Sequence, residues 1–151
     1  MNDRALDFDT RVKLAIYRHF AATGKRPSPT EIANGVGAGV DEVRESFGRL
    51  RANRMLFLEP DGETIRMAPP FSGVPTQHHV LAGNRDYVAN CAWDALGIVA
   101  ALREPATVIS ECAQSRERLE LEVTPDGPVK SDWVFHCLVP AARWWADLVH
   151  T

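Results

Sequence analysis

The residues best suited to chemistry in this sequence are a thiol and a carboxylate three positions apart, Cys91 and Asp94. Positions i and i+3 share one face of an α-helix, so the two side chains would point the same way. They lie in an apolar run, residues 87–98, that is long enough to be buried. Catalysis by a thiol requires at least the nucleophilic sulfur and a neighbouring group that can accept or donate a proton. We therefore predict that Cys91 and Asp94 act together.

The surrounding pattern predicts that Cys91 stands at the N-terminus of a helix. Residues 87–90 should end a strand, and residues 92–102 should form a helix that Arg103-Glu104-Pro105 ends. Unpaired backbone N–H groups and the helix dipole favour a thiolate at such a position. We therefore expect the pKa of Cys91 to be depressed.

The remaining candidate ligands favour structural roles. The three cysteines are widely spaced and form no C-x-x-C motif, which argues against a zinc knuckle or a disulfide framework. Burial is the commonest fate of a cytosolic cysteine, so Cys112, at a strand end, and Cys137, in an apolar strand, are predicted to be structural. His78 and His79 are adjacent in a predicted strand and would point to opposite faces, which disfavours a shared metal.

Length and composition exclude several classes of protein. A chain of 151 residues with 45% hydrophobic and 25% charged residues forms one compact domain, or two small ones with a shared core. The net charge of −3 argues against non-specific attraction to nucleic acid or an anionic membrane. No apolar run reaches the roughly 18–20 residues that span a bilayer, and residues 1–4 lack a secretion-signal profile. We expect a cytoplasmic protein.

The helices and strands that would position these residues are predicted to form an α+β fold in three parts. Residues 1–68 read as a winged-helix-like unit with helices at 8–23, 30–34 and 40–53 and a hairpin at 55–67. Residues 69–85 form a Pro/Gly-rich linker and a first strand. Residues 86–151 form a small mixed or antiparallel sheet with packed helices. Its further elements are predicted strands at 106–110, 119–123 and 133–139 and a helix at 141–149.

Three helices followed by a hairpin is the order of elements in a winged helix, and such a fold can bind DNA through its third helix. Arg44, Arg49, Arg51 and Arg54 favour it, whereas Asp41, Glu42 and Glu45 at the start of that helix would repel phosphates. Basic and acidic residues nearly balance in residues 1–66. A packing role is therefore favoured over nucleic-acid binding.

The sequence resembles the alkylmercury (organomercurial) lyase family. The resemblance rests on Asn90-Cys91-Ala92-Trp93-Asp94-Ala95-Leu96, which matches the family's C-A-x-D-x-L core. Further support comes from Pro70-Phe71-Ser72, Cys112, Leu138-Val139-Pro140-Ala141 and Trp144-Trp145. The resemblance covers nearly the whole chain, and it implies that the winged-helix-like unit is a scaffold.

The resemblance also implies protonolytic cleavage of a mercury–carbon bond in a small organomercurial. Mercury(II) is soft and prefers thiolates, so Cys91 would bind it and Asp94 would transfer the proton that releases the hydrocarbon. A carboxyl group in an apolar pocket has the raised pKa that this needs. Both residues would meet mercury, which is substrate and product, and no other cofactor is implied. Cys112 matches a structural cysteine, and cellular thiols or a mercury reductase would accept the product.

One departure from the family concerns the second mercury-binding cysteine. The family places it after the Trp-Trp helix in a pattern like T-C-x-x-x-x-F-F, and this chain ends at His150-Thr151, where it is expected next. Cys137 comes too early for that role and is only a weak candidate ligand. We expect a truncated chain, and hypothesise that the next codon is a UGA for selenocysteine that was read as a stop. Nucleotide sequence beyond Thr151 decides this.

Two other functions stay open. One is a catalytically silent homologue that binds mercury or another soft metal. The other is a winged-helix transcription regulator whose C-terminal half senses a ligand. Mercury binding without carbon release would favour the first, and salt-dependent binding of genomic DNA would favour the second.

Overall fold

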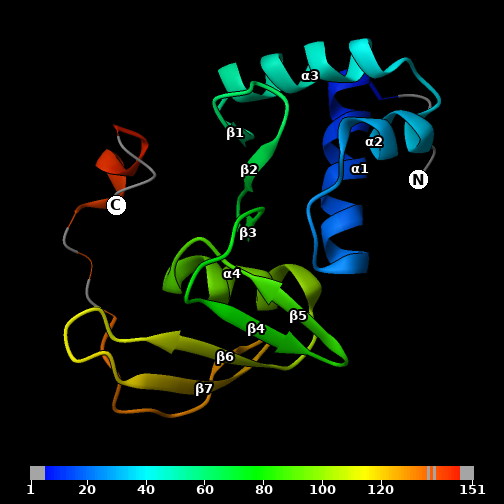
Figure 1. Ribbon diagram of the computed structural model, residues 1–151. Coiled ribbons are helices and arrows are strands. Elements are labelled where there is room, and N and C mark those ends of the chain that lie inside the picture. Colours follow the sequence, from blue (N-terminus) through cyan, green and yellow to red (C-terminus); the bar gives the residue numbers. More distant parts are fainter. Residues whose placement is uncertain (1–5, 136, 138, 147–151) are drawn as a thin grey trace.

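The computed structural model describes residues 6–135, 137 and 139–146, and it confirms the predicted α+β class (Figure 1). Its helices are α1 (Phe8–Thr23), α2 (Pro29–Val36), α3 (Val40–Ala52), α4 (Ala92–Leu102) and the 3-10 helix η2 (Ala141–Ala146). Its strands are β1 (Phe57–Leu58), β2 (Ile65–Ala68), β3 (Phe71–Ser72), β4 (His79–Ala82), β5 (Arg85–Val88), β6 (Ala106–Glu111), β7 (Arg118–Thr124) and β8 (Gly127–Pro128). All pairings are antiparallel, in the orders β1-β2-β3 and β5-β4-β6-β7-β8.

Helix α1 has the predicted bounds because both of its ends are capped. The Asp7 side chain accepts a hydrogen bond from the Thr10 backbone N–H at 3.0 Å, and Gly24 ends the helix with a φ of 71°. A Cβ at Gly24 would collide with the carbonyl oxygen of Asp86, so glycine lets α1 end directly against β5.

Helix α2 begins with a capping box. The Ser28 hydroxyl accepts from the Glu31 N–H, and the Glu31 carboxylate accepts from the Ser28 N–H at 2.8 Å. The helix continues to Val36, two residues past the predicted end, because Gly35 stays helical and Gly37 is the residue that turns left-handed.

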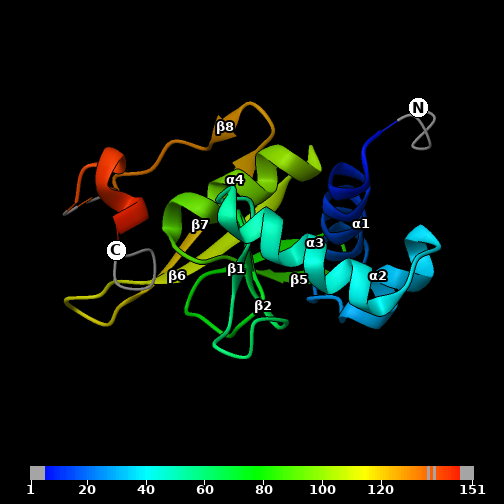
Figure 2. The ribbon, with the colours of Figure 1, turned by 90° about the horizontal axis from the view of Figure 1, so that it is seen from above.

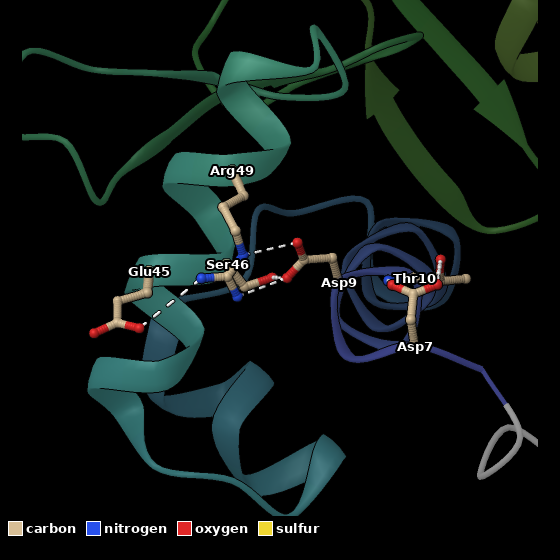
Figure 3. Close-up of polar contacts among 6 residues, drawn as sticks. All are labelled: Asp7, Asp9, Thr10, Glu45, Ser46 and Arg49. Atoms are coloured by element: carbon tan, nitrogen blue, oxygen red, sulfur yellow. Dashed lines mark hydrogen bonds and ion pairs between the residues drawn. The ribbon is translucent and has the colours of Figure 1, made fainter.

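Helix α3 is tied to α1 by the polar cluster in Figure 3. The Asp9 carboxylate accepts from Arg49 Nε and Nη2, both at 2.8 Å, and from the buried Ser46 hydroxyl at 2.7 Å. Arg44, also of α3, forms ion pairs with Asp41 of the same helix and with Glu63 between β1 and β2. These arginines are engaged by carboxylates of the chain itself, which favours a packing role over phosphate binding for α3. That residues 1–68 form a winged helix, and the domain boundaries, stay predictions.

Strand β3 joins the helical half to the second sheet. It was predicted only as extended linker, but it pairs with β2, and Phe71 also bridges to Ala89. The Phe71 ring stacks on Phe20 of α1 at 5.2 Å and lies 6.0 Å from Tyr87 of β5. The core is therefore continuous from α1 through β3 to the sheet that carries α4.

Helix α4 lies over one face of the five-stranded sheet (Figures 1 and 2). It contacts β4, β6, β7 and β8, and its buried residues are Ala95, Ile98 and Val99. Burial of the Ile98 or the Val99 side chain contributes about 1.5–3 kcal/mol each. The predicted strands at 106–110 and 119–123 are confirmed as β6 and β7, and the apolar face of β7 turns toward the core.

The predicted strand at 133–139 is wrong. Its described residues pair with no strand, and Trp133, Val134 and Phe135 are exposed. The short strand β8 pairs with the edge of β7 instead. Of the predicted helix at 141–149, residues 141–146 form η2, and the rest lies outside the described residues. None of the described helices combines the length and apolarity that crossing a membrane requires.

Candidate functional site

Cys91 occupies the predicted position at the start of α4. It is the N-cap residue, with extended backbone (φ −151°), and its sulfur accepts a hydrogen bond from the Asp94 backbone N–H at 3.5 Å. The cap forms because β5 ends at Val88 and the helical pattern begins at Ala92. Cys91 therefore replaces the usual Ser, Thr, Asp or Asn cap with a nucleophilic sulfur.

The predicted meeting of the thiol and the carboxylate is confirmed. Cys91 Sγ lies 3.7 Å from Asp94 Oδ2, a distance at which the thiol donates to the carboxylate oxygen. Both side chains are half-buried, so each is partly shielded from water and keeps some exposed surface. A proton can pass between sulfur and oxygen without an intervening group.

The pKa of Cys91 shifts opposite to the prediction. Burial raises it above its ordinary value, because desolvation of the thiolate outweighs the hydrogen bonds from backbone N–H groups, and the nearby Asp94 charge raises it further. Burial also raises the pKa of Asp94, as predicted, against the opposing hydrogen bonds from Asn90 and Cys91. The pair is therefore set to share a proton over a range above the ordinary carboxyl pKa.

Two residues near the carboxylate were not predicted. Asn90 donates its side-chain N–H to Asp94 Oδ2 at 3.1 Å, and its position four residues before Asp94 was the available clue. Tyr17 of α1 donates to the Pro69 carbonyl at 2.9 Å, and its own pKa is raised by burial and by the Asp94 charge. No local pattern links Tyr17 to this site, because α1 lies far away in the sequence.

The other two cysteines come from later segments of the chain, Cys112 after β6 and Cys137 before η2. Cys112 follows β6 and accepts from the Ser115 N–H at 3.5 Å, and hydrogen bonds to Ser115 lower its pKa. Its predicted place at a strand end is confirmed, although it is only half-buried. Cys137 is exposed and donates to the Val139 carbonyl, so its predicted burial in a strand is wrong.

Cys137 lines a surface pocket that reaches α4 through Trp93. The Trp93 ring lies 6.1 Å from Phe135 and 6.5 Å from Trp144. The lining residues are Trp93, Phe135, Cys137, Pro140, Ala141 and Trp144. In the part of the chain that the structure describes, no three His, Cys, Asp or Glu side chains cluster to hold a metal ion.

The chain is similar to known proteins at the level of family and of fold. The alkylmercury lyase family model matches residues 71–151, which include α4 and all three cysteines. A crystal structure of the mercury-bound form of MerB2 superimposes with a TM-score of 0.64 at 22% sequence identity. The alignment covers 86% of this chain and 63% of that structure. No curated protein matches the sequence.

Proposed function

Because the chain belongs to the alkylmercury lyase family, we propose that it cleaves the carbon–mercury bond of small organomercurials by protonolysis. The observation that carries this proposal is the 3.7 Å contact between Cys91 Sγ and Asp94 Oδ2. It joins a soft nucleophile for mercury to a proton carrier in a partly desolvated site. Cys91 and Asp94 are the proposed catalytic residues.

The first step transfers the organomercury group to sulfur. The Cys91 thiol gives its proton to Asp94, and the sulfur lone pair forms the S–Hg bond while the original ligand of mercury, such as chloride or a thiolate, departs. Burial raises the pKa of Asp94, and this makes its carboxylate a stronger acceptor for the thiol proton than an exposed carboxylate would be. The protein now carries an S–Hg–carbon adduct beside a protonated carboxyl.

The second step releases the hydrocarbon. The carbon–mercury bond breaks, its electron pair takes the Asp94 proton, and the hydrocarbon leaves while mercury(II) stays on Cys91. A second thiol then gives its proton to the Asp94 carboxylate, and its sulfur forms the second bond of the two-coordinate mercury. Mercury is substrate and product throughout, and we propose no resident cofactor. Cellular thiols or a mercury reductase would accept the product in a cytoplasmic setting.

The proposal is tested by headspace gas chromatography. The purified protein is incubated with methylmercury and excess thiol, and methane is measured against a protein-free control. Methane formation above that control supports the lyase. Stoichiometric mercury binding without methane would instead favour the silent mercury-binding homologue.

The pH profile of kcat/KM should be bell-shaped and displaced toward alkaline pH. Activity requires one proton on the pair, so it rises as Asp94 loses its proton and falls as Cys91 loses its own. Burial raises both pKa values, above the ordinary 3.8 of the carboxyl and 9.0 of the thiol. Methane release measured from acid to alkaline pH checks this; a flat profile, or an acid limb at the ordinary carboxyl pKa, contradicts it.

Cys137 is the proposed internal source of the second thiol, with an external thiol as the alternative. It is exposed and shares its pocket with Trp93, two positions from Cys91. Cys137→Ser should leave methane release in the first turnover unchanged. It should weaken retention of mercury(II) at least several-fold, because oxygen is a poor ligand for mercury. Dialysis against a thiol competitor measures retention, with Cys112→Ser as matched control. Unchanged retention assigns the second ligand to an external thiol.

A further inference from the structure

Asn90, directly before the thiol, makes three contacts that converge on the catalytic carboxyl. Its Nδ2 lies 3.1 Å from Asp94 Oδ2 and 3.4 Å from the carbonyl oxygens of both Pro70 and Phe71. All three partners are acceptors, so the chemistry fixes which end of the amide faces them. Turning the amide over would place its oxygen against three other oxygens.

The same carboxylate oxygen faces both Asn90 and Cys91. Asp94 Oδ2 accepts the amide N–H of Asn90 and lies 3.7 Å from Cys91 Sγ. The amide thus locks the rotation of the carboxyl group and presents Oδ2 to the thiol. A hydrogen bond to the charged form stabilises it, and this opposes the burial that raises the pKa of Asp94.

The amide oxygen of Asn90 argues against a role in packing alone. It is buried, and no described residue donates a hydrogen bond to it. A buried unpaired acceptor is costly, so an apolar side chain of similar size would suit this position better if only packing mattered. The useful part of the side chain is therefore its N–H group.

We propose that Asn90 is a positioning residue for the protonolysis, whose amide ties the Asp94 carboxyl to the Pro70–Phe71 backbone and aims Oδ2 at Cys91. This rests on the proposed function, since it assigns a role within the same site. The titratable groups that face Asp94 are Cys91, at the start of α4, and Tyr17, from α1. The Tyr17 hydroxyl does not replace the Asn90 N–H, because it donates to the Pro69 carbonyl instead.

The test compares Asn90→Ala, Asn90→Gln and the exposed control Asn34→Ala. Each variant is first checked for a wild-type circular dichroism spectrum. The Asp94 carboxyl is then titrated by carbon-13 NMR without mercury, which gives a result even if the protein proves to have no lyase activity. Methane release is measured over the same pH range, with kcat and KM separated.

Asn90→Ala should raise the pKa of Asp94, move the acid limb of the pH profile to higher pH and lower kcat by about tenfold, with little change in KM. The expected fall in kcat matches the worth of one hydrogen bond to a charged group. Asn90→Gln keeps an amide N–H, so it should change each of these quantities less than Asn90→Ala does. Asn34→Ala should match the wild type. The proposal is overturned if the folded Asn90→Ala keeps the wild-type pKa of Asp94, or if neither Asn90 variant folds, which would make Asn90 a structural residue.

Discussion

Asp94→Asn should take up methylmercury on Cys91 and release almost no methane. Asparagine keeps the size of the side chain and an oxygen to accept the Asn90 N–H, but it carries no transferable proton. Loss of a general acid costs about 10²–10⁴-fold in rate. Removing the carboxylate charge also lowers the pKa of Cys91, since that charge raises it, so the thiolate stays available for mercury. Headspace methane measures the loss, and mercury content of the desalted protein measures uptake.

The matched control for this variant is Asp126→Asn, which makes the same change in an exposed turn between β7 and β8. It should release methane at the wild-type rate. If Asp94→Asn does the same, the proton comes from another group or from water, and the role assigned to Asp94 is wrong. Loss of mercury uptake together with methane would show instead that Asp94 is needed before the carbon–mercury bond is broken.

Cys91→Ser should lose both methane release and mercury uptake at the site. A hydroxyl is a hard ligand and does not ionise near neutral pH, so it neither binds mercury nor passes a proton to Asp94. Removing a catalytic nucleophile costs on the order of 10³-fold or more, which places the variant at the uncatalysed background. Uptake is measured as the mercury bound per protein after exposure to one equivalent of methylmercury.

Cys112→Ser is the control for that result, because it makes the same substitution in the turn that follows β6. It should keep the methane rate and lose at most a little stability. Should Cys91→Ser still release methane while Cys112→Ser does not, the nucleophile has been assigned to the wrong cysteine.

The parts of this site that depend on neighbours in sequence could be predicted. The helix that begins at Ala92 was recognisable from its apolar pattern and from the strand before it, and this placed Cys91 at the N-cap beside Asp94. The Ser28 capping box was predictable for the same reason, since its partners lie three residues apart.

The parts that depend on tertiary contacts could not be predicted. Asn90 reaches the carbonyl of Pro70, 20 residues away, and Tyr17 reaches Pro69 from 52 residues away. The direction of the Cys91 pKa shift follows from how deeply α4 is packed, which a helix N-terminus alone does not reveal. The apolar run at 133–139 resembles a strand, but a strand also needs a partner edge, and β8 already pairs with β7.

The most direct test of the account is the mass of the protein after a single turnover with methylmercury. The wild-type chain should gain mercury without its methyl group, and peptide mapping should place that mercury on Cys91. One equivalent of methane should appear in the headspace at the same time. A stable adduct that keeps the methyl group, or mercury held only by Cys112 or Cys137, would contradict a site in which Cys91 takes the metal while Asp94 protonates the carbon.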